Sequence, residues 1–136
     1  MKETLFLFAL FTGLTHAQDL KDHRWKNRLV IVYSDHFENT LAKEQISELN
    51  AHPKALKDRK IALYHITPAG YRVYGSDKVF ALDRPLNIEI PFEVQLVGLD
   101  GGVKFSSREV EPVETFNSLI DDMPMRKTEL KERNGQ

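Results

Sequence analysis

The sequence predicts an α/β domain: a central mixed sheet of about four strands, flanked by helices. Three observations indicate this class. A continuous, mostly β-branched apolar run over Arg28–Ser34 is typical of a central strand covered on both faces. Apolar residues at helical spacing follow it, and a second such stripe occurs over 113–123. An Asp-Gly-Gly turn at 100–102 separates two further apolar runs and predicts a hairpin.

The first half of the chain alternates strand, helix and strand. After Arg28–Ser34, the apolar spacing predicts a helix over 38–49 and a further turn over 54–57. The second strand is expected over 60–67, before the Pro-Ala-Gly that ends it. The stretch that follows shows no sustained period, and we expect only a short helix there, over 77–82.

The second half predicts a hairpin and one helix. Strands over 92–99 and 103–107 run antiparallel, and their apolar residues alternate toward the helix that follows. That helix begins at Pro112, buries Phe116 among its apolar stripe, and ends at Pro124.

Residues 127–136 form a charged tail that we expect to be frayed. Asp121 and Arg126 are five residues apart with a proline between them, so we do not expect them to pair with each other. Arg126 is expected at the surface, where its replacement by alanine costs within about 1 kcal/mol.

The order is therefore a βαβ unit followed by ββα, which is the thioredoxin-like arrangement. The alternative is a small ferredoxin-like α+β domain. Residues 18–126 contain all the predicted elements.

Residues 1–17 are expected to be a signal peptide. Lys2 precedes a largely apolar run of ten residues over 5–14, and small residues lead to Ala17, after which cleavage is predicted. A run of ten is too short to span a bilayer, which takes about 20 residues. We therefore expect a secreted or periplasmic protein with no transmembrane anchor after cleavage.

Composition excludes several classes of function. The chain has 19 basic and 20 acidic residues, a formal net charge of −1, so bulk attraction to nucleic acid is not supported. Cysteine is absent, which excludes disulfides, thiolate nucleophiles and Cys-ligated metal sites. No cofactor is expected.

No catalytic or metal site is predicted. Ser34, Asp35 and His36 are adjacent, whereas triads are assembled from separated segments, so a turn and helix cap is the favoured interpretation. The histidines that follow residue 17 show no HxH or HxxxH spacing, which leaves only a dispersed site open. They are His23, His36, His52 and His65.

Three further features have two interpretations each. Met123 and Met125 form an MxM pair that suits Cu(I), but Met123 also completes an apolar helix stripe. Lys104, Arg108 and Arg126 either gather as an anion patch or are ordinary surface charges. Trp25 is expected to plug the end of the core rather than to bind a ligand.

Three stretches together resemble the domain-of-unknown-function family 4174 (DUF 4174). They are the Arg-Trp-Lys-Asn-Arg approach to the first strand, the hairpin around Asp-Gly-Gly, and the Ile-Asp-Asp-Met-Pro-Met-Arg ending. Leu99 departs from the lysine often found before Asp-Gly-Gly. The resemblance implies a thioredoxin-like, peroxiredoxin-related fold, found in small exported proteins and in extracellular-matrix proteins, and it supplies no activity. The motif residues of unknown role are Trp25, Arg28, Asp100, Gly101, Gly102, Lys104, Asp121, Met123, Pro124, Met125 and Arg126.

Two functions remain open. The favoured one is a non-catalytic exported binding or adhesion-type module, whose partner is an unknown protein or an envelope or extracellular component. The alternative is an exported enzyme with non-thiol, possibly metal-dependent chemistry. A pocket lined by His36, His65 and carboxylates would favour the enzyme.

Overall fold

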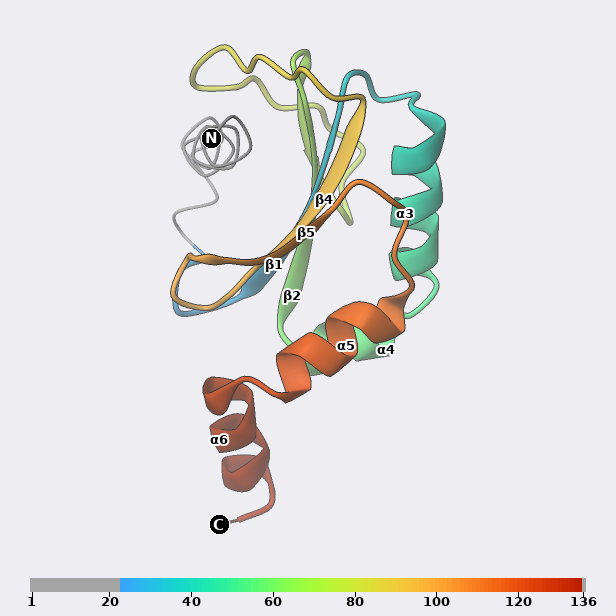
Figure 1. The fold of residues 1–136 in the computed structure, drawn as a ribbon. Coiled ribbons are helices and arrows are strands. Elements are labelled where there is room, and N and C mark those ends of the chain that lie inside the picture. Colours follow the sequence, from blue (N-terminus) through green and yellow to red (C-terminus); the bar gives the residue numbers. More distant parts are fainter. Residues whose placement is uncertain (1–22, 136) are drawn as a thin grey trace, which may run out of the picture.

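The computed structural model describes residues 23–135, so the predicted signal peptide and its cleavage site lie outside the described residues. Helices and strands alternate along the chain (Figure 1). In order they are β1 (Arg28–Ser34), α3 (Thr40–Asn50), α4 (Pro53–Asp58), β2 (Ile61–Thr67), β3 (Gly70–Val73), β4 (Phe92–Val97), β5 (Val103–Ser107), α5 (Val113–Asp121) and α6 (Pro124–Arg133).

One five-stranded sheet, in the order β3-β2-β1-β4-β5, organises the fold. The β1–β2 pair is parallel and the other three pairs are antiparallel, which confirms a mixed α/β domain. The fifth strand, β3, was not expected. It forms because Thr67 Oγ1 accepts the N–H of Ala69 at 3.1 Å and so turns the chain back against β2.

The ferredoxin-like alternative is wrong for this chain. A split βαβ unit places another strand between its two parallel strands. Here β1 and β2 are direct neighbours, with Val30 opposite Leu63 and Val32 opposite His65.

Helices α3, α4 and α5 lie on the same side of the sheet (Figure 1). Asn39 caps α3, since its side chain accepts the N–H of Ala42 at 3.0 Å. Buried residues of α3 and α5 pack against alternate residues of β1 and β4 to form the first core. Phe105 of β5 meets Phe116 edge-on, with ring centroids 6.1 Å apart, as the alternation of the hairpin predicted. The same alternation also placed Val97 and Val103 toward that helix, which is wrong, because both pack on the opposite face of the sheet. A register irregularity between Leu96 and Val97 interrupts that alternation.

The opposite face of the sheet is covered by an extended segment instead of a helix. The short helix expected over 77–82 is absent; Phe80 exchanges two backbone hydrogen bonds with Tyr71, at 2.9 and 2.8 Å. Side chains two residues apart, Phe80 and Leu82, and later Leu86 and Ile88, pack on the second core. This period of two is the pattern of extended chain, which explains why no helix forms.

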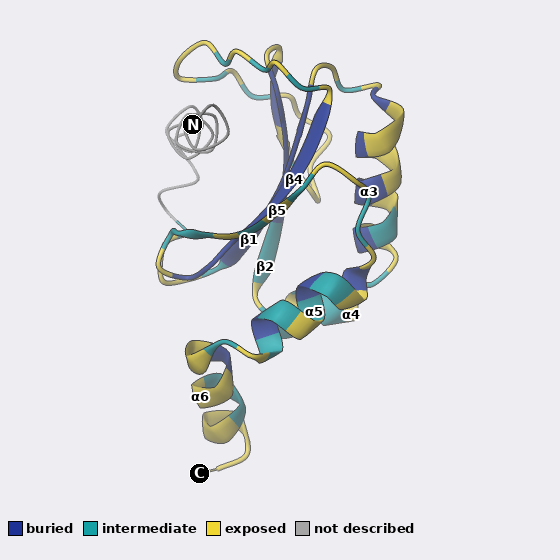
Figure 2. Cartoon of the chain, viewed as in Figure 1, coloured by how far each residue is buried: buried dark blue, intermediate teal, exposed yellow. Residues whose placement is uncertain are grey.

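The C-terminal stretch differs most from expectation. Pro124 begins helix α6 instead of ending the structured chain, because proline at the first helical position loses no hydrogen bond. The helix runs to Arg133 beyond the end of the sheet (Figure 1). Most of the helix is exposed (Figure 2). Arg126 is nevertheless buried, with 3% of its surface exposed. The surface position expected for Arg126 is therefore wrong.

Candidate functional site

The motif residues of the sequence separate into two groups at the end of the sheet where β1 begins. The first group is an ion network. Arg28 is fully buried and donates to both carboxylate oxygens of Glu129, at 3.3 and 3.2 Å, and to the carbonyl oxygen of Arg59 at 2.8 Å. This bidentate geometry joins β1 to α6.

Arg126 completes the network from the other side. Its guanidinium contacts Asp58 Oδ2 at 2.6 Å, Asp121 Oδ1 at 3.3 Å and Glu129 Oε1 at 3.4 Å. The Asp121–Arg126 pair that the spacing argued against therefore exists, because the chain turns between α5 and α6. Arg59 holds the pKa of the Asp121 carboxyl below its usual range, with Arg126 adding to the effect.

This network serves to hold α6 in place. Met123 packs against the first core, as the apolar stripe predicted, whereas Met125 is 43% exposed. The two methionines thus differ in surroundings, and core packing accounts for Met123. The charges of the network are matched in close pairs, and through Arg28, Asp121 and Arg126 they connect α6 to β1, α4 and α5.

The second group of motif residues shapes the β4–β5 hairpin. Asp100 accepts the N–H of Gly102 at 2.9 Å and pairs with Lys104 at 2.9 Å. The Lys104 ammonium lowers the pKa of the Asp100 carboxyl. Gly101 has φ +86, a conformation that glycine adopts without strain.

Trp25 lies beside this hairpin but does not plug the core. Its backbone N–H donates to the Leu99 carbonyl at 2.7 Å, while its side chain is 59% exposed. The Arg24 guanidinium lies 5.8 Å from the centroid of the indole ring. The backbone of Trp25 has a positive φ (+68), which is uncommon for a residue other than glycine.

The anion patch considered for Lys104, Arg108 and Arg126 does not form. Lys104 pairs with Asp100, Arg108 lies 3.7 Å from Glu93, and Arg126 belongs to the ion network. Each cation therefore has its own acidic partner, in a different place.

The histidines are also dispersed. His23 bonds to Tyr64 at 2.8 Å, His36 to Asp35 at 2.6 Å, and His52 lies 3.8 Å from Glu48. Over residues 23–135, no group of three or more His, Asp or Glu side chains is arranged to hold a metal ion.

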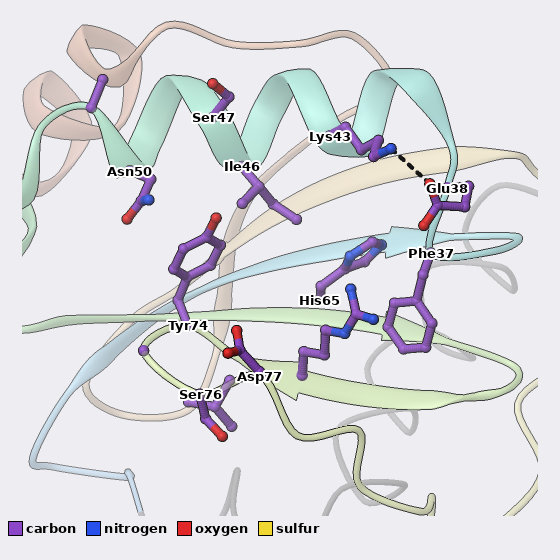
Figure 3. A pocket seen from close by; sticks show the side chains of 14 residues that line it. Phe37, Glu38, Lys43, Ile46, Ser47, Asn50, His65, Tyr74, Ser76 and Asp77 are labelled. Atoms are coloured by element: carbon purple, nitrogen blue, oxygen red, sulfur yellow. Dashed lines mark hydrogen bonds and ion pairs between the residues drawn. The ribbon is translucent and has the colours of Figure 1, made fainter.

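The β3 edge of the sheet carries a site that the sequence does not predict. A hollow of about 1010 Å³ opens between α3 and the β2–β3 pair, with Phe37 and His65 at one end and Asn50 and Tyr74 at the other (Figure 3). Its walls are Phe37, Glu38, Lys43, Ile46, Ser47, Asn50, Ala51, His65, Arg72, Val73 and the turn 74–77.

Ser34 and His65 form a buried hydrogen bond beneath this hollow, 2.7 Å from Oγ to Nε2. The Ser34 hydroxyl also contacts the His36 carbonyl at 2.8 Å. A carbonyl only accepts, so the hydroxyl proton goes to His36, and His65 Nε2–H must donate to Ser34 Oγ. Ser34 is thus oriented as a structural donor and is not an activated nucleophile.

The same bond determines the state of His65. Burial, with a contribution from Arg72, lowers the pKa of the His65 ring to about 4, so the ring is neutral at pH 7. With its proton on Nε2, the ring presents Nδ1 as a hydrogen-bond acceptor. Within residues 23–135, Nδ1 has no hydrogen-bond partner, and it is not fully enclosed by the protein.

Arg72 is the neighbour of His65 across the β2–β3 pair. Its guanidinium lies 4.4 Å from the centroid of the Phe37 ring, and that ring meets His65 edge-on at 5.1 Å. In the part of the chain that the structure describes, Arg72 forms no ion pair or hydrogen bond through its guanidinium. The stacking holds this cation at the hollow without neutralising it.

The other charges that line the hollow are Lys43, Glu38 and Asp77, so the four charges, with Arg72 included, sum to zero. Lys43 pairs with Glu38 at 2.7 Å, and this pairing lowers the pKa of the Glu38 carboxyl. Asp77 lies on the turn after β3. Of the two histidines that an enzymatic pocket was expected to contain, His65 lines the hollow, together with the carboxylates of Glu38 and Asp77, and His36 does not.

The chain is thus a mixed α/β domain without cysteine, in which an open polar hollow lies beside the first long helix. A family model described as "Domain of unknown function (DUF4174)" matches residues 19–129, and the chain belongs to this family. Searches among curated proteins and among solved structures found no match. None of the helices within residues 23–135 is long and apolar enough to cross a membrane.

Proposed function

We propose that this protein is an exported, thioredoxin-like binding module that performs no redox chemistry, and that the hollow between α3 and the β2–β3 pair is its ligand site. The strand order supports the thioredoxin-like assignment: β1, α3 and β2 form a parallel crossover, and β4 pairs antiparallel to β1 before β5 and α5 follow. The extended segment over 74–91 takes the place of a second crossover helix.

The proposal rests on two side chains that face the hollow. Arg72 forms no ion pair, and the neutral His65 ring presents Nδ1 as a hydrogen-bond acceptor. Ser34 beside them already donates its hydroxyl proton to the His36 carbonyl. Thioredoxin-like redox domains place a reactive thiolate after the first strand. In this chain the corresponding stretch, 34–38, contains no sulfur, and a serine hydroxyl such as that of Ser34 cannot exchange disulfides. The groups around it are arranged to bind, since polar atoms without partners favour a ligand that supplies them.

The binding role is tested by blocking the hollow. Ser47 is exposed on the face of α3 that lines it, so Ser47→Trp fills the hollow without entering the core. We expect native mass spectrometry of the exported protein to show a retained small molecule or peptide that Ser47→Trp loses. A control, Glu44→Trp, is also exposed on α3 and does not line the hollow. Equal retention by both variants would place the binding site elsewhere.

The absence of thiol chemistry has its own test. Because the chain contains no cysteine, purified protein should neither reduce insulin disulfides nor consume peroxide above a protein blank. Turnover proportional to protein concentration would favour the enzymatic alternative.

Export is tested at the N-terminus. Sequencing of the native protein should begin at Gln18, because small residues precede it after the apolar run. Recovery of intact Met1 from a cytosolic fraction would contradict export.

A further inference from the structure

We propose that the hollow beside α3 binds the C-terminal carboxylate of a short peptide, with Arg72 pairing to the carboxylate and His65 Nδ1 accepting the N–H of the terminal residue. This inference rests on the proposed binding function and specifies the ligand.

Charge favours a single negative charge on the ligand. The hollow is lined by two cations, Lys43 and Arg72, and two carboxylates, Glu38 and Asp77. Lys43 is already paired with Glu38. Arg72 forms no ion pair among the described residues, although its charge also contributes to the lowered pKa of the Glu38 carboxyl. Because the two cations and two carboxylates of the lining sum to zero, a dianion such as a phosphate monoester would leave two uncompensated charges in the hollow, whereas a monocarboxylate leaves one and can pair with Arg72.

Hydrogen bonding favours an amide N–H next to that carboxylate. His65 Nδ1 is an acceptor, because the ring proton is used at Nε2 toward Ser34. Arg72 offers only donors. The terminal residue of a peptide carries a carboxylate and an N–H on the same carbon, so one residue supplies a partner to each side chain. A simple carboxylic acid such as acetate leaves Nδ1 without a donor.

The shape of the hollow favours a peptide over a free amino acid. Lys43, Ser47 and Asn50 lie on one face of α3, and seven residues of helix span about 10 Å. An extended chain of about three residues covers this length. Ser47 and Asn50 provide hydrogen-bonding side chains for its backbone, and Ile46 and Tyr74 provide apolar surface. At about 1010 Å³, the hollow exceeds the needs of a single residue.

The experiment compares two peptides that differ only at the C-terminus. Acetyl-trialanine with a free carboxylate and the same peptide capped as a C-terminal amide are titrated into the isotope-labelled protein and followed by NMR. We expect the acid to shift the signals of His65 and Arg72, including the ¹⁵N resonance of Nδ1, and to bind about tenfold or more tightly than the amide.

Two matched arginine variants show which side chain binds the carboxylate. Arg72→Gln should lose about tenfold in affinity for the acid peptide and little for the amide. The control is Arg24→Gln, because Arg24 is also an exposed arginine against an aromatic ring, at the opposite end of the sheet. It should bind both peptides as the unchanged protein does.

Several outcomes would overturn the inference. Equal affinity for acid and amide, with shifts in the hollow, means that the site binds peptides without reading the carboxylate; the proposed binding function would then stand. Acetate or free alanine binding as tightly as the peptide would indicate a small-acid site. If no probe moves these signals at millimolar concentration, peptide capture is wrong, and the retained-ligand comparison of Ser47→Trp decides separately whether the hollow binds anything.

Discussion

The arginines at the two ends of the sheet have opposite surroundings. Where β1 begins, Arg28, Arg59 and Arg126 are enclosed by Asp58, Asp121 and Glu129 and hold α6 against the domain. Where β2 turns into β3, Arg72 is stacked on Phe37 and forms no ion pair in the described chain. Matched charges close a surface and stabilise it, whereas an unmatched, positioned charge leaves binding energy available for a ligand.

The largest effect is expected at the closed end. Arg126→Ala leaves Asp58, Asp121 and Glu129 without a shared cation and should lower the free energy of unfolding by about 3–4 kcal/mol, on the low side for a buried ion pair because two of the carboxylates are part-exposed. Urea denaturation measures it, and Phe116→Ala, at about 3–5 kcal/mol, is the reference for a buried side chain. A loss below about 1 kcal/mol would mean that the network does not hold α6.

A pH effect of about 2 kcal/mol is expected at the open end. The pKa of His65 is lowered from 6.5 in the unfolded chain to about 4 in the folded one, so the unfolded state binds more protons between these values. The contribution of neutral His65 to the free energy of unfolding is therefore fully present above pH 6.5 and is lost as the pH falls toward 4. At pH 5 the loss is about 2 kcal/mol.

Denaturation at pH 7.5 and pH 5 measures this loss. His65→Gln keeps an N–H donor for Ser34 and does not titrate, so it should flatten this part of the profile. An unchanged slope in the variant would assign the pH dependence to other groups.

The strand that carries Arg72 depends on one glycine. Gly70 has φ +143, and a Cβ there would lie 2.6 Å from the Phe80 carbonyl oxygen. Gly70→Ala should lower the free energy of unfolding by about 1–2 kcal/mol. It should also weaken ligand binding, because β3 must shift to accommodate the added Cβ. Gly75→Ala is the control, since φ is also positive (+101) but no atom lies within 4 Å of the added Cβ. Equal losses in the two variants would show that backbone strain, and not the Phe80 contact, sets the cost.

The smallest effect is expected for Arg72 itself. Arg72→Gln removes a stacked, exposed cation and should change the free energy of unfolding by less than about 1 kcal/mol. Set beside Arg126→Ala in the same urea experiment, it directly compares the two ends. A loss as large as that of Arg126→Ala would make Arg72 a structural residue and remove the main support for the ligand site.

The sequence alone predicts the elements that have a clear period. The β-branched run of β1, the apolar stripe of α3 and the glycine turn before β5 all appear in the structure, within two residues of the expected bounds for α3. In the stretch 71–90 the sequence predicts a short helix, whereas the structure has extended chain. The reason is that Phe80 and Leu82 pack on the second core at a period of two, and the residues around them are largely polar. Its strand β3 is too short to show a period of its own.

The hollow could not be predicted for a different reason. His65 and Arg72 belong to neighbouring strands, but nothing near Arg72 in the sequence indicates that it lies opposite His65. The region after Pro124 reads as a polar tail because the acidic partner that buries Arg126, Asp58, is 68 residues away in the chain.

Composition and local pattern determine that this sequence contains no cysteine, that its core is a mixed sheet, and that its charge is nearly balanced. Only the tertiary structure decides which arginines are neutralised. Arg126 and Arg72 both lie in polar stretches, and an arginine is charged in either setting. Their difference arises because chain segments distant in sequence bring carboxylates to Arg126, whereas the β2–β3 register brings a neutral histidine to Arg72.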